Sequence, residues 1–367
     1  MYFENKMADL LCEYSLNLKK GDTVEIRGEI AAEPLIKACY IKLLEMGCYP
    51  VVRMSFTEQL YSFYKYAEKK QLEFIPDAHM TAAKTINAMI NIDCEINTKQ
   101  LTGVDSGKIA TNRKAMSVLK DIMFDREAKG DFSWVIAPYP TSSMAQDAEM
   151  SFDEYAEFVF GACKLNENNP VELWAKVSEY QEKIVESLSG IQELRIEGKD
   201  TDLTLNVSGR KWINCNGSHN MPDGEVFTSP VEDSANGEMF FDVPTSFMGV
   251  SAKNVHLTFK NGRVVKAKAE KGEDFLSKML DTDEGARVVG EIAFGLNNAI
   301  KKATGNILFD EKIGRSMHLA VGSSYPEAGG KNKSGLHWDL IKDMRKDAAV
   351  YADGKQIYKN GKFLGIE

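Results

Sequence analysis

Residues 23–56, TVEIRGEIAAEPLIKACYIKLLEMGCYPVVRMSF, decide the fold of the first half of the chain. Two apolar runs, TVEIRG and YPVVRMSF, flank a helical pattern that begins at residue 33 and ends at Gly47, a typical residue at a helix C-terminus. A strand, a helix and a second strand in this order favour a parallel sheet with a right-handed crossover. We therefore expect an α/β domain near the N-terminus.

Helical and strand patterns also alternate on both sides of this unit. Residues 3–17 form an amphipathic helical pattern, and further strands are expected at residues 88–96 and 132–140. Two long helical patterns follow, at residues 151–166 and 170–190, and Pro170 and Gly190 mark the start and the end of the second.

Beyond about residue 190 the pattern becomes mainly strands. Residues 193–209 alternate apolar and polar side chains around a charged turn, as a hairpin does. The pair Asn261-Gly262 lies between two alternating runs, and Asp353-Gly354 and Asn360-Gly361 repeat this turn signal near the C-terminus. We expect a β-rich region of antiparallel hairpins.

Length and composition fit two globular domains. A chain of 367 residues is long for a single domain, and 43% hydrophobic residues provide ample core. We expect an α/β N-terminal domain with a mainly parallel sheet at residues 1–188. A β-rich α+β domain that carries the chemistry is expected at residues 189–367.

Charge and targeting features exclude several classes of partner. The net charge of −9 argues against a nucleic-acid partner. No stretch approaches the roughly 20 apolar residues of a membrane span, and the N-terminus lacks the pattern of a signal peptide. The six cysteines are scattered without a C-x-x-C pair and are expected to be reduced. We expect a cytoplasmic protein with no membrane partner.

Two of the five histidines fall in residues 318–339, HLAVGSSYPEAGGKNKSGLHWD. His337 is followed two positions later by Asp339, and on a strand this spacing puts both side chains on one face, where they can chelate one divalent cation. Imidazole and carboxylate together suit zinc, cobalt, manganese or iron better than calcium or magnesium.

Two glutamates and His318 are further candidate ligands. Glu291 lies in the apolar segment VVGEIAFG, where an unpaired carboxylate would cost several kcal/mol and therefore requires a cation. Glu225 in GEVFTSP would, alone, be typical of a solvated carboxylate, and His318 alone would be typical of a hydrogen-bonded core histidine. Only their combination indicates a metal site.

The other candidates have simpler interpretations. His79 and His256 have no carboxylate at a useful spacing and are interpreted as structural. His219, in the loop before GEVF, could line the site or be an ordinary loop histidine. Lys331 and Lys333 could support an oxyanion or be solvated.

In order and motif, the segments GEVFTSP, VVGEIAFG and HLAVGSSYPEAGGKNKSGLHWD resemble the thermophilic aminopeptidase family, the dinuclear metallopeptidases of aminopeptidase T and aminopeptidase S type. The resemblance is specific over about residues 210–340 and loose over the whole chain. It implies an active-site tyrosine at Tyr325. Glu311, in the motif LFDE, lies further before His318 than in better-known members. The implied metal ligands are Glu225, Glu291, Glu311, His318, His337 and Asp339.

The resemblance implies a metalloaminopeptidase that acts on peptides with a free N-terminus. Two divalent cations, zinc, cobalt or manganese rather than magnesium, would lower the pKa of a water molecule and polarise the scissile carbonyl. Glu291 is expected to bridge them, with Glu225 and His318 on one ion and His337 and Asp339 on the other. A homodimer is implied by the resemblance alone.

Two alternatives remain open. One is another dinuclear hydrolase, a dipeptidase or an amidase. The other is a metal-binding protein without enzymatic activity, against which the carboxylate-rich ligand set argues, because structural zinc sites are usually four-coordinate and rich in cysteine.

Overall fold

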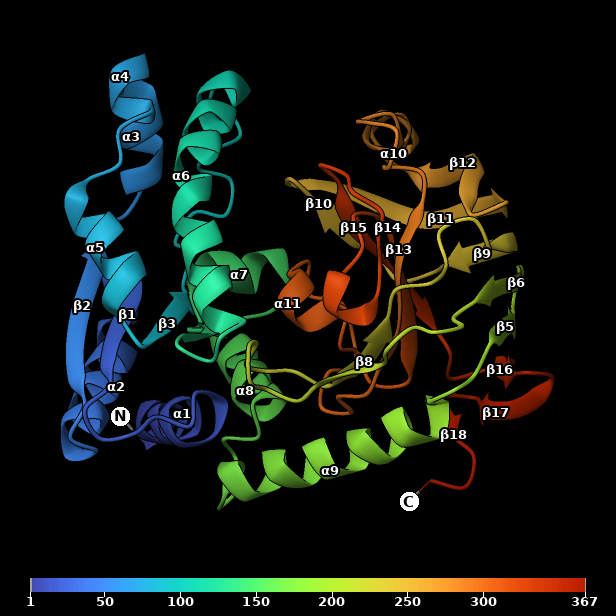
Figure 1. The fold of residues 1–367 in the computed structure, drawn as a ribbon, viewed down its shortest axis with the longest axis horizontal. Helices are drawn as coiled ribbons and strands as arrows, with labels where there is room; N and C mark the ends of the chain where they lie inside the picture. Colours follow the sequence, from blue (N-terminus) through green and yellow to red (C-terminus); the bar gives the residue numbers. More distant parts are fainter. Residues whose placement is uncertain (1, 367) are drawn as a thin grey trace. The chain divides into compact units, whose positions relative to one another are not determined.

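The structure is a computed structural model that describes residues 2–366. The chain divides into two compact units, and each is described separately here (Figure 1). Unit 1 comprises Met1–Leu173 and Gly217–Met221, and unit 2 comprises Trp174–Asn216 and Pro222–Glu367. The boundary between the units lies at Leu173 and Trp174, inside helix α9 (Pro170–Leu188), whereas the boundary expected from the sequence, residue 188, is the last residue of that helix.

Unit 1 contains a four-stranded parallel sheet in the order β2-β1-β3-β4. Its strands are β1 (Thr23–Glu29), β2 (Tyr49–Ser55), β3 (Ala88–Asp93) and β4 (Ser133–Pro138). The expected mainly parallel sheet is therefore confirmed.

Helices connect the successive strands of this sheet. Helix α2 (Glu33–Glu45) leads from β1 to its neighbour β2. Helices α3, α4 and α5 then lead from β2 to β3, on the other side of β1. Right-handed crossovers would put α2 on one face of the sheet and α3, α4 and α5 on the other. The expected opening helix is divided into α1 and a π-helical segment, Leu10–Ser15. The remaining bounds are α1 (Tyr2–Asp9), α3 (Gln59–Tyr66), α4 (Lys69–Leu72), α5 (Asp77–Thr85), α6 (Ser106–Glu127), α7 (Ser142–Asp147) and α8 (Phe152–Ala162).

Unit 2 contains two sheets, and the larger one has nine strands. Its main path runs β10-β11-β9-β6-β5-β16-β17-β18, and β12 pairs with β11. The strands are β5 (Glu193–Gly198), β6 (Thr201–Asn206), β9 (Asn236–Phe241), β10 (Thr245–Phe247), β11 (Val250–Lys260), β12 (Arg263–Lys271), β16 (Ala349–Ala352), β17 (Lys355–Lys359) and β18 (Lys362–Phe363).

The three turn signals of the sequence form two-residue hairpin loops in this sheet. Asn261 and Gly262 join β11 to β12 with φ values of 48° and 76°. The pairs at 353–354 and 360–361 join β16 to β17 and β17 to β18, again with positive φ at both residues. Positive φ at both central residues is typical of the type I′ turn, whose twist matches that of the flanking strands.

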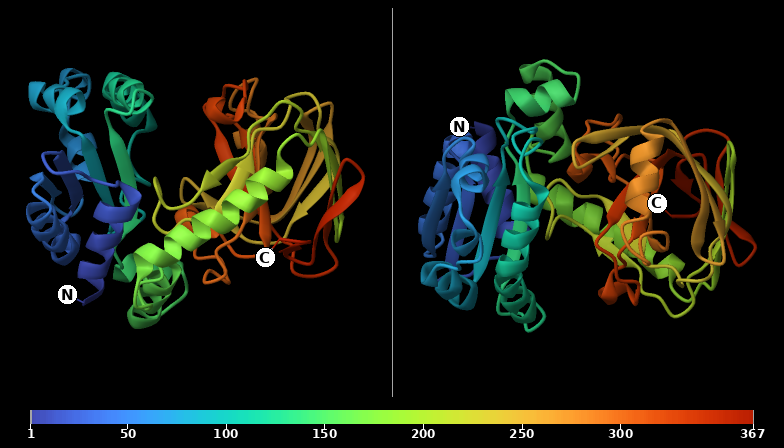
Figure 2. Two further views of the ribbon diagram at one scale, coloured as in Figure 1. Left: turned by 60° about the horizontal axis from the view of Figure 1, so that its bottom comes forward. Right: turned by 90° about the horizontal axis from the view of Figure 1, so that it is seen from above.

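The smaller sheet has five antiparallel strands in the order β15-β14-β13-β8-β7. They are β7 (Ile213–Cys215), β8 (Glu225–Thr228), β13 (Val289–Gly295), β14 (Ser316–Gly322) and β15 (His337–Asp343). Unit 2 also contains α10 (Glu273–Leu280), α11 (Ile307–Asp310) and a 3-10 turn at Pro326–Ala328. Figure 2 shows α9 as a long helix beside the strands of unit 2.

The core of unit 2 includes side chains from both of its sheets. The five-stranded sheet contributes alternate residues, which leaves its opposite face for other side chains. These core residues are Val226, Val289, Ile292, Phe294, Met317, Leu319, Val321, Trp338 and Leu340. Among residues 2–366, none of the helices combines the length and the hydrophobicity that a bilayer span requires.

Candidate metal centre

Strand register puts Glu225, Glu291 and His318 on one face of the five-stranded sheet. Ala293 lies directly opposite His318, and Gly295 lies directly opposite Glu225. Directly opposite residues share a face, and so do residues two apart along one strand. Because positions 291, 293 and 295 alternate along β13, the three side chains point to the same side.

The same argument adds the H-x-D pair from β15. Ala320 on β14 lies opposite Glu291 on one side and Asp339 on the other, and Gly322 lies opposite His337. Asp339 and His337 therefore share the face of Glu291.

Small residues occupy the middle of this face. Ala293 and Ala320 are fully buried; Ala320 lies between Glu291 and Asp339 on the neighbouring strands, and Ala293 lies opposite His318. Their methyl groups leave space above the sheet that a larger side chain would fill.

Two overlapping groups of potential ligands form above these alanines. His318 Nε2 lies 3.4 Å from Glu291 Oε1 and 3.6 Å from Glu225 Oε2. His337 Nε2 lies 3.4 Å from Glu291 Oε2 and 3.5 Å from Asp339 Oδ1. Within each group the potential ligand atoms lie within 4.8 Å of one another. Glu291 belongs to both groups and presents one carboxylate oxygen to each histidine.

Backbone carbonyl groups orient both imidazole rings. Nδ1 of His318 donates to the carbonyl oxygen of Glu311 at 3.0 Å, and Nδ1 of His337 donates to the carbonyl oxygen of Ser323 at 2.8 Å. A carbonyl oxygen can only accept, so each Nδ1 carries the proton. In the neutral tautomer Nε2 therefore presents a lone pair, the arrangement that metal-bound histidines commonly show.

The electrostatics of the site demand positive charge. Burial raises the pKa of Glu225 to about 8. Burial opposes protonation of His318, but hydrogen bonding to Glu291 and the nearby carboxylates raise its pKa to about 10. Burial likewise opposes protonation of His337, yet Asp339 and Glu291 raise its pKa to about 12. Without a metal ion, protons would have to balance these carboxylates.

Two buried carboxylate oxygens indicate that the residues of this site can bind divalent cations. Glu225 Oε2 and Asp339 Oδ1 are buried and have no hydrogen-bond partner, although a buried carboxylate oxygen is costly to leave unpaired. Each belongs to one of the two ligand groups. Two imidazoles and three carboxylates are a donor set that suits zinc, cobalt or manganese.

Tyr325 borders the centre. Its ring is partly buried and packs edge-on against the imidazole of His337, with the centroids 5.2 Å apart. The ring also contacts the ring of Phe227. The backbone N–H of Tyr325 donates a hydrogen bond to Ser229 Oγ at 3.0 Å. Burial, followed by the negative charge of Glu291, raises the pKa of Tyr325, so its hydroxyl remains a proton donor.

Glu311 lies in the turn after α11 and belongs to neither of the two histidine-containing groups. Its carboxylate contacts the ammonium of Lys312. Lys312 was not recognised in the sequence, although it follows directly on the LFDE motif. Cys215 and Asp223 were also missed; with Glu225 they form a third group of potential ligand atoms.

The remaining histidines lie outside these groups. His219 belongs to unit 1, where Nε2 lies 2.7 Å from Glu127 Oε1. His256 on β11 packs against the ring of Phe240, and His79 lies on α5. Their interpretation as structural histidines stays a prediction.

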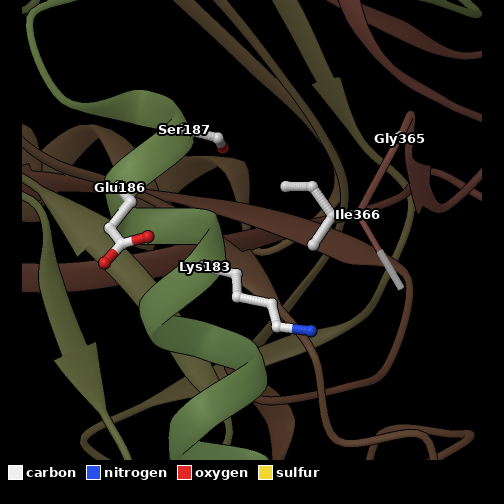
Figure 3. Close-up of a pocket in the computed structure, with 5 residues that line it drawn as sticks. All are labelled: Lys183, Glu186, Ser187, Gly365 and Ile366. Atoms are coloured by element: carbon white, nitrogen blue, oxygen red, sulfur yellow. The ribbon is translucent and has the colours of Figure 1, made fainter.

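A surface hollow beside α9 lacks a comparable donor set. The described residues that line it are Lys183, Glu186, Ser187, Gly365 and Ile366 (Figure 3). A single carboxylate beside an ammonium does not form a chelating group.

Lys331 and Lys333 are exposed, as solvated lysines are.

The thermophilic metalloprotease family (M29) matches residues 4–363. The chain belongs to this family. Among curated relatives, aminopeptidase AmpS of Bacillus subtilis is 30% identical and the alignment covers 97% of each chain. Aminopeptidase T of Thermus aquaticus is 27% identical, with 88% of this chain and 85% of that protein aligned. The family resemblance and the prediction of a metal-dependent aminopeptidase are thus confirmed.

Solved structures support the fold. Wild-type AmpT from Thermus thermophilus superposes with a TM-score of 0.85 at 24% identity and covers 99% of each chain. A 2,5-dihydroxypyridine dioxygenase from Pseudomonas putida gives a TM-score of 0.60 at 13% identity, covering 100% of this chain and 97% of that one. At these identities both likenesses concern the fold alone, and the first confirms the predicted fold class.

Proposed function

We propose that the two histidine-containing groups each hold one divalent cation and that the chain uses them to release N-terminal amino acids from peptides. The observation that carries the proposal is the position of Glu291, whose two oxygens each lie 3.4 Å from a different histidine Nε2. A shared carboxylate of this kind is typical of two-metal hydrolases, in which the ions lie about 3.5–4 Å apart.

The proposed ligand assignment follows the two groups. Glu225 and His318 complete one site, and His337 and Asp339 complete the other, with Glu291 common to both. Zinc, cobalt or manganese suits these donors better than magnesium, which prefers oxygen ligands and water. When bound, the two cations would supply an activated water molecule and polarise the scissile carbonyl.

Tyr325 is proposed to donate a hydrogen bond to the oxyanion that forms at the scissile carbonyl. Its contact with the His337 ring places it beside one ligand group, and its raised pKa keeps the hydroxyl protonated. Removal of one such donor commonly costs about 10²- to 10³-fold in rate.

Specificity for the chain end is proposed to come from the free α-amino group of the peptide. An amine is attracted to a carboxylate-rich site and can itself act as a ligand, whereas an acylated amine has lost both properties. Two relatives that align with 97% of this chain are named aminopeptidases, which supports this choice over a general amidase.

The test combines metal content with substrate scope. Purified protein is expected to contain about two divalent ions per chain. It should hydrolyse at least one of the leucyl, arginyl and aspartyl chromogenic amides and leave N-acetylated versions intact. Cleavage of acylated amides at equal rates would show an amidase, and cleavage of dipeptides alone would show a dipeptidase.

The cellular setting and assembly form part of the same proposal. We place the protein in the cytoplasm, because six free cysteines, five of them buried, suit a reducing compartment. A homodimer is proposed from the family resemblance, and light scattering on purified protein measures it directly.

A further inference from the structure

Tyr325 lies at the start of a tight turn, residues 325–331, which we call the tyrosine turn. Its carbonyl oxygen accepts a hydrogen bond from the N–H of Gly330 at 2.9 Å. Gly330 in turn packs closely against the residue before the tyrosine, because a Cβ there would lie 2.5 Å from Ser324 Cβ. The backbone of Tyr325 is therefore coupled to the end of the turn.

The segment that follows strand β8 holds both ends of the tyrosine turn. At the start, the N–H of Tyr325 donates to the hydroxyl of Ser229, a fully buried residue. At the end, the N–H of Lys331 donates to Glu232 Oε1 at 2.7 Å. Because Lys331 directly follows Gly330, the bond to Glu232 also restrains the backbone that closes on Tyr325.

A buried guanidinium holds Glu232 in its place. Arg210 Nη2 lies 2.6 Å from Glu232 Oε2, and only 7% of the Arg210 side chain is exposed. The arginine also packs against the tyrosine turn, because a Cβ on Gly329 would lie 3.3 Å from Arg210 Cδ. Partial burial raises the pKa of Glu232, but backbone N–H groups and Arg210 lower it overall, so the side chain stays a carboxylate. Its two oxygens join Arg210 to Lys331.

Stability alone explains this ion pair poorly. A buried guanidinium is costly, and an apolar pair of similar volume often holds a fold equally well. Arg210 Nη1 adds to the cost, because it is buried and has no hydrogen-bond partner. The pair does supply directional bonds, which an apolar pair would lack.

We propose that Arg210 and Glu232 are positioning residues for Tyr325, because their ion pair fixes the tyrosine turn and thereby keeps the phenol hydroxyl beside the metal ligands. This inference rests on the proposed function of Tyr325 as an oxyanion donor. Misplacement of a catalytic group by about 1 Å can cost on the order of 10²-fold in rate, so the turn needs a defined geometry.

Glu232→Gln tests the pair with little change in size. The carboxylate offers one oxygen to each donor, whereas an amide has a single oxygen and turns its NH₂ group toward the other donor. We expect kcat to fall by roughly 10-fold, with KM within a few fold and metal content unchanged. Asp202→Asn is the matched control, because it makes the same change in the ion pair with Arg195 in the nine-stranded sheet, and it should leave kcat unchanged.

A double-mutant cycle separates positioning from a general effect on stability. If the pair acts through the Tyr325 hydroxyl, Glu232→Gln should lower kcat by less than about 2-fold in a Tyr325→Phe background. An equal loss in both backgrounds would overturn the inference, and so would an unchanged kcat in Glu232→Gln alone. A Tyr325→Phe protein with the kcat of its parent would instead contradict the proposed function of the tyrosine, and the inference with it.

Two further measurements do not depend on the folding of Glu232→Gln. Arg210→Met combined with Glu232→Met leaves no unpaired charge and should repeat both the loss of kcat and its absence in the Tyr325→Phe background. The kcat of the parent in this double variant would overturn the inference. In the parent protein, the Lys331 N–H should be protected from hydrogen exchange, and exchange as fast as in an unstructured peptide would also overturn it.

Discussion

Replacing Glu291 by glutamine should weaken both metal sites, whereas replacing Glu225 by glutamine should weaken only one. Glutamine keeps the size of the side chain and one carbonyl oxygen but removes the charge. Glu291 belongs to both histidine-containing groups, and Glu225 belongs to only one of them. The matched pair of substitutions therefore tests which carboxylate is shared.

The size of the effect follows from the distances. Each oxygen of Glu291 lies 3.4 Å from a histidine nitrogen. An ion bound between these atoms would lie no farther than about 3.4 Å from the carboxylate oxygen, and at an effective dielectric constant of about 20 a unit charge then contributes at least about 5 kcal/mol for each unit charge on the ion. The amide oxygen that remains offsets part of this, so the affinity for each ion should fall by on the order of 10²- to 10³-fold, at about 1.4 kcal/mol per tenfold change.

Competition titrations with a chromogenic chelator measure the two affinities separately. We expect both dissociation constants to rise in Glu291→Gln and only one to rise in Glu225→Gln. If Glu291→Gln lost one ion and held the other with its original affinity, Glu291 would not be the shared ligand.

Further predictions concern the metal, the ligands, the tyrosine and the sheet. Removal of metal by a chelator should abolish peptidase activity, and added Co²⁺ or Zn²⁺ should restore it; activity that persists in verified metal-free protein would refute a metal-dependent mechanism. His337→Ala should lose activity and lower metal content, while His256→Ala should leave both nearly unchanged; equal losses would show that the ligands are misassigned. Tyr325→Phe should retain metal and lower kcat by on the order of 10²-fold, and an unchanged kcat would remove the tyrosine from the mechanism. Gly290→Ala should destabilise the fold by about 1–3 kcal/mol in chemical denaturation, because its Cβ would lie 2.2 Å from the carbonyl oxygen of Ser323; unchanged stability would show that the backbone yields there.

Local sequence signals predicted most of the fold. The parallel sheet follows from the unit at residues 23–56, and the three two-residue turns follow from Asn-Gly and Asp-Gly pairs. These signals depend on neighbouring residues alone. The division of the opening helix at residue 10 was not predicted, because a π-helical segment has no reliable sequence signature.

The candidate ligands were predicted by combining spacing with family resemblance. The H-x-D spacing indicated that His337 and Asp339 share a face, and the register of β14 and β15 agrees. The full burial of the Lys312 side chain beside Glu311 was not predicted, because it depends on how the turn after α11 packs in the fold. Cys215 likewise looked like any buried cysteine until the fold brought Asp223 beside it.

The two faces of the five-stranded sheet have a consequence for folding. Alternate residues along β13, β14 and β15 either join the hydrophobic core or face the candidate ligand groups. A slip of one residue between strands would exchange these roles, burying imidazoles and carboxylates in the core and exposing Leu319 and Trp338. Only the native pairing can then gain the free energy of metal binding. In a newly made chain, metal binding would therefore stabilise the native strand register relative to registers that are shifted by one residue.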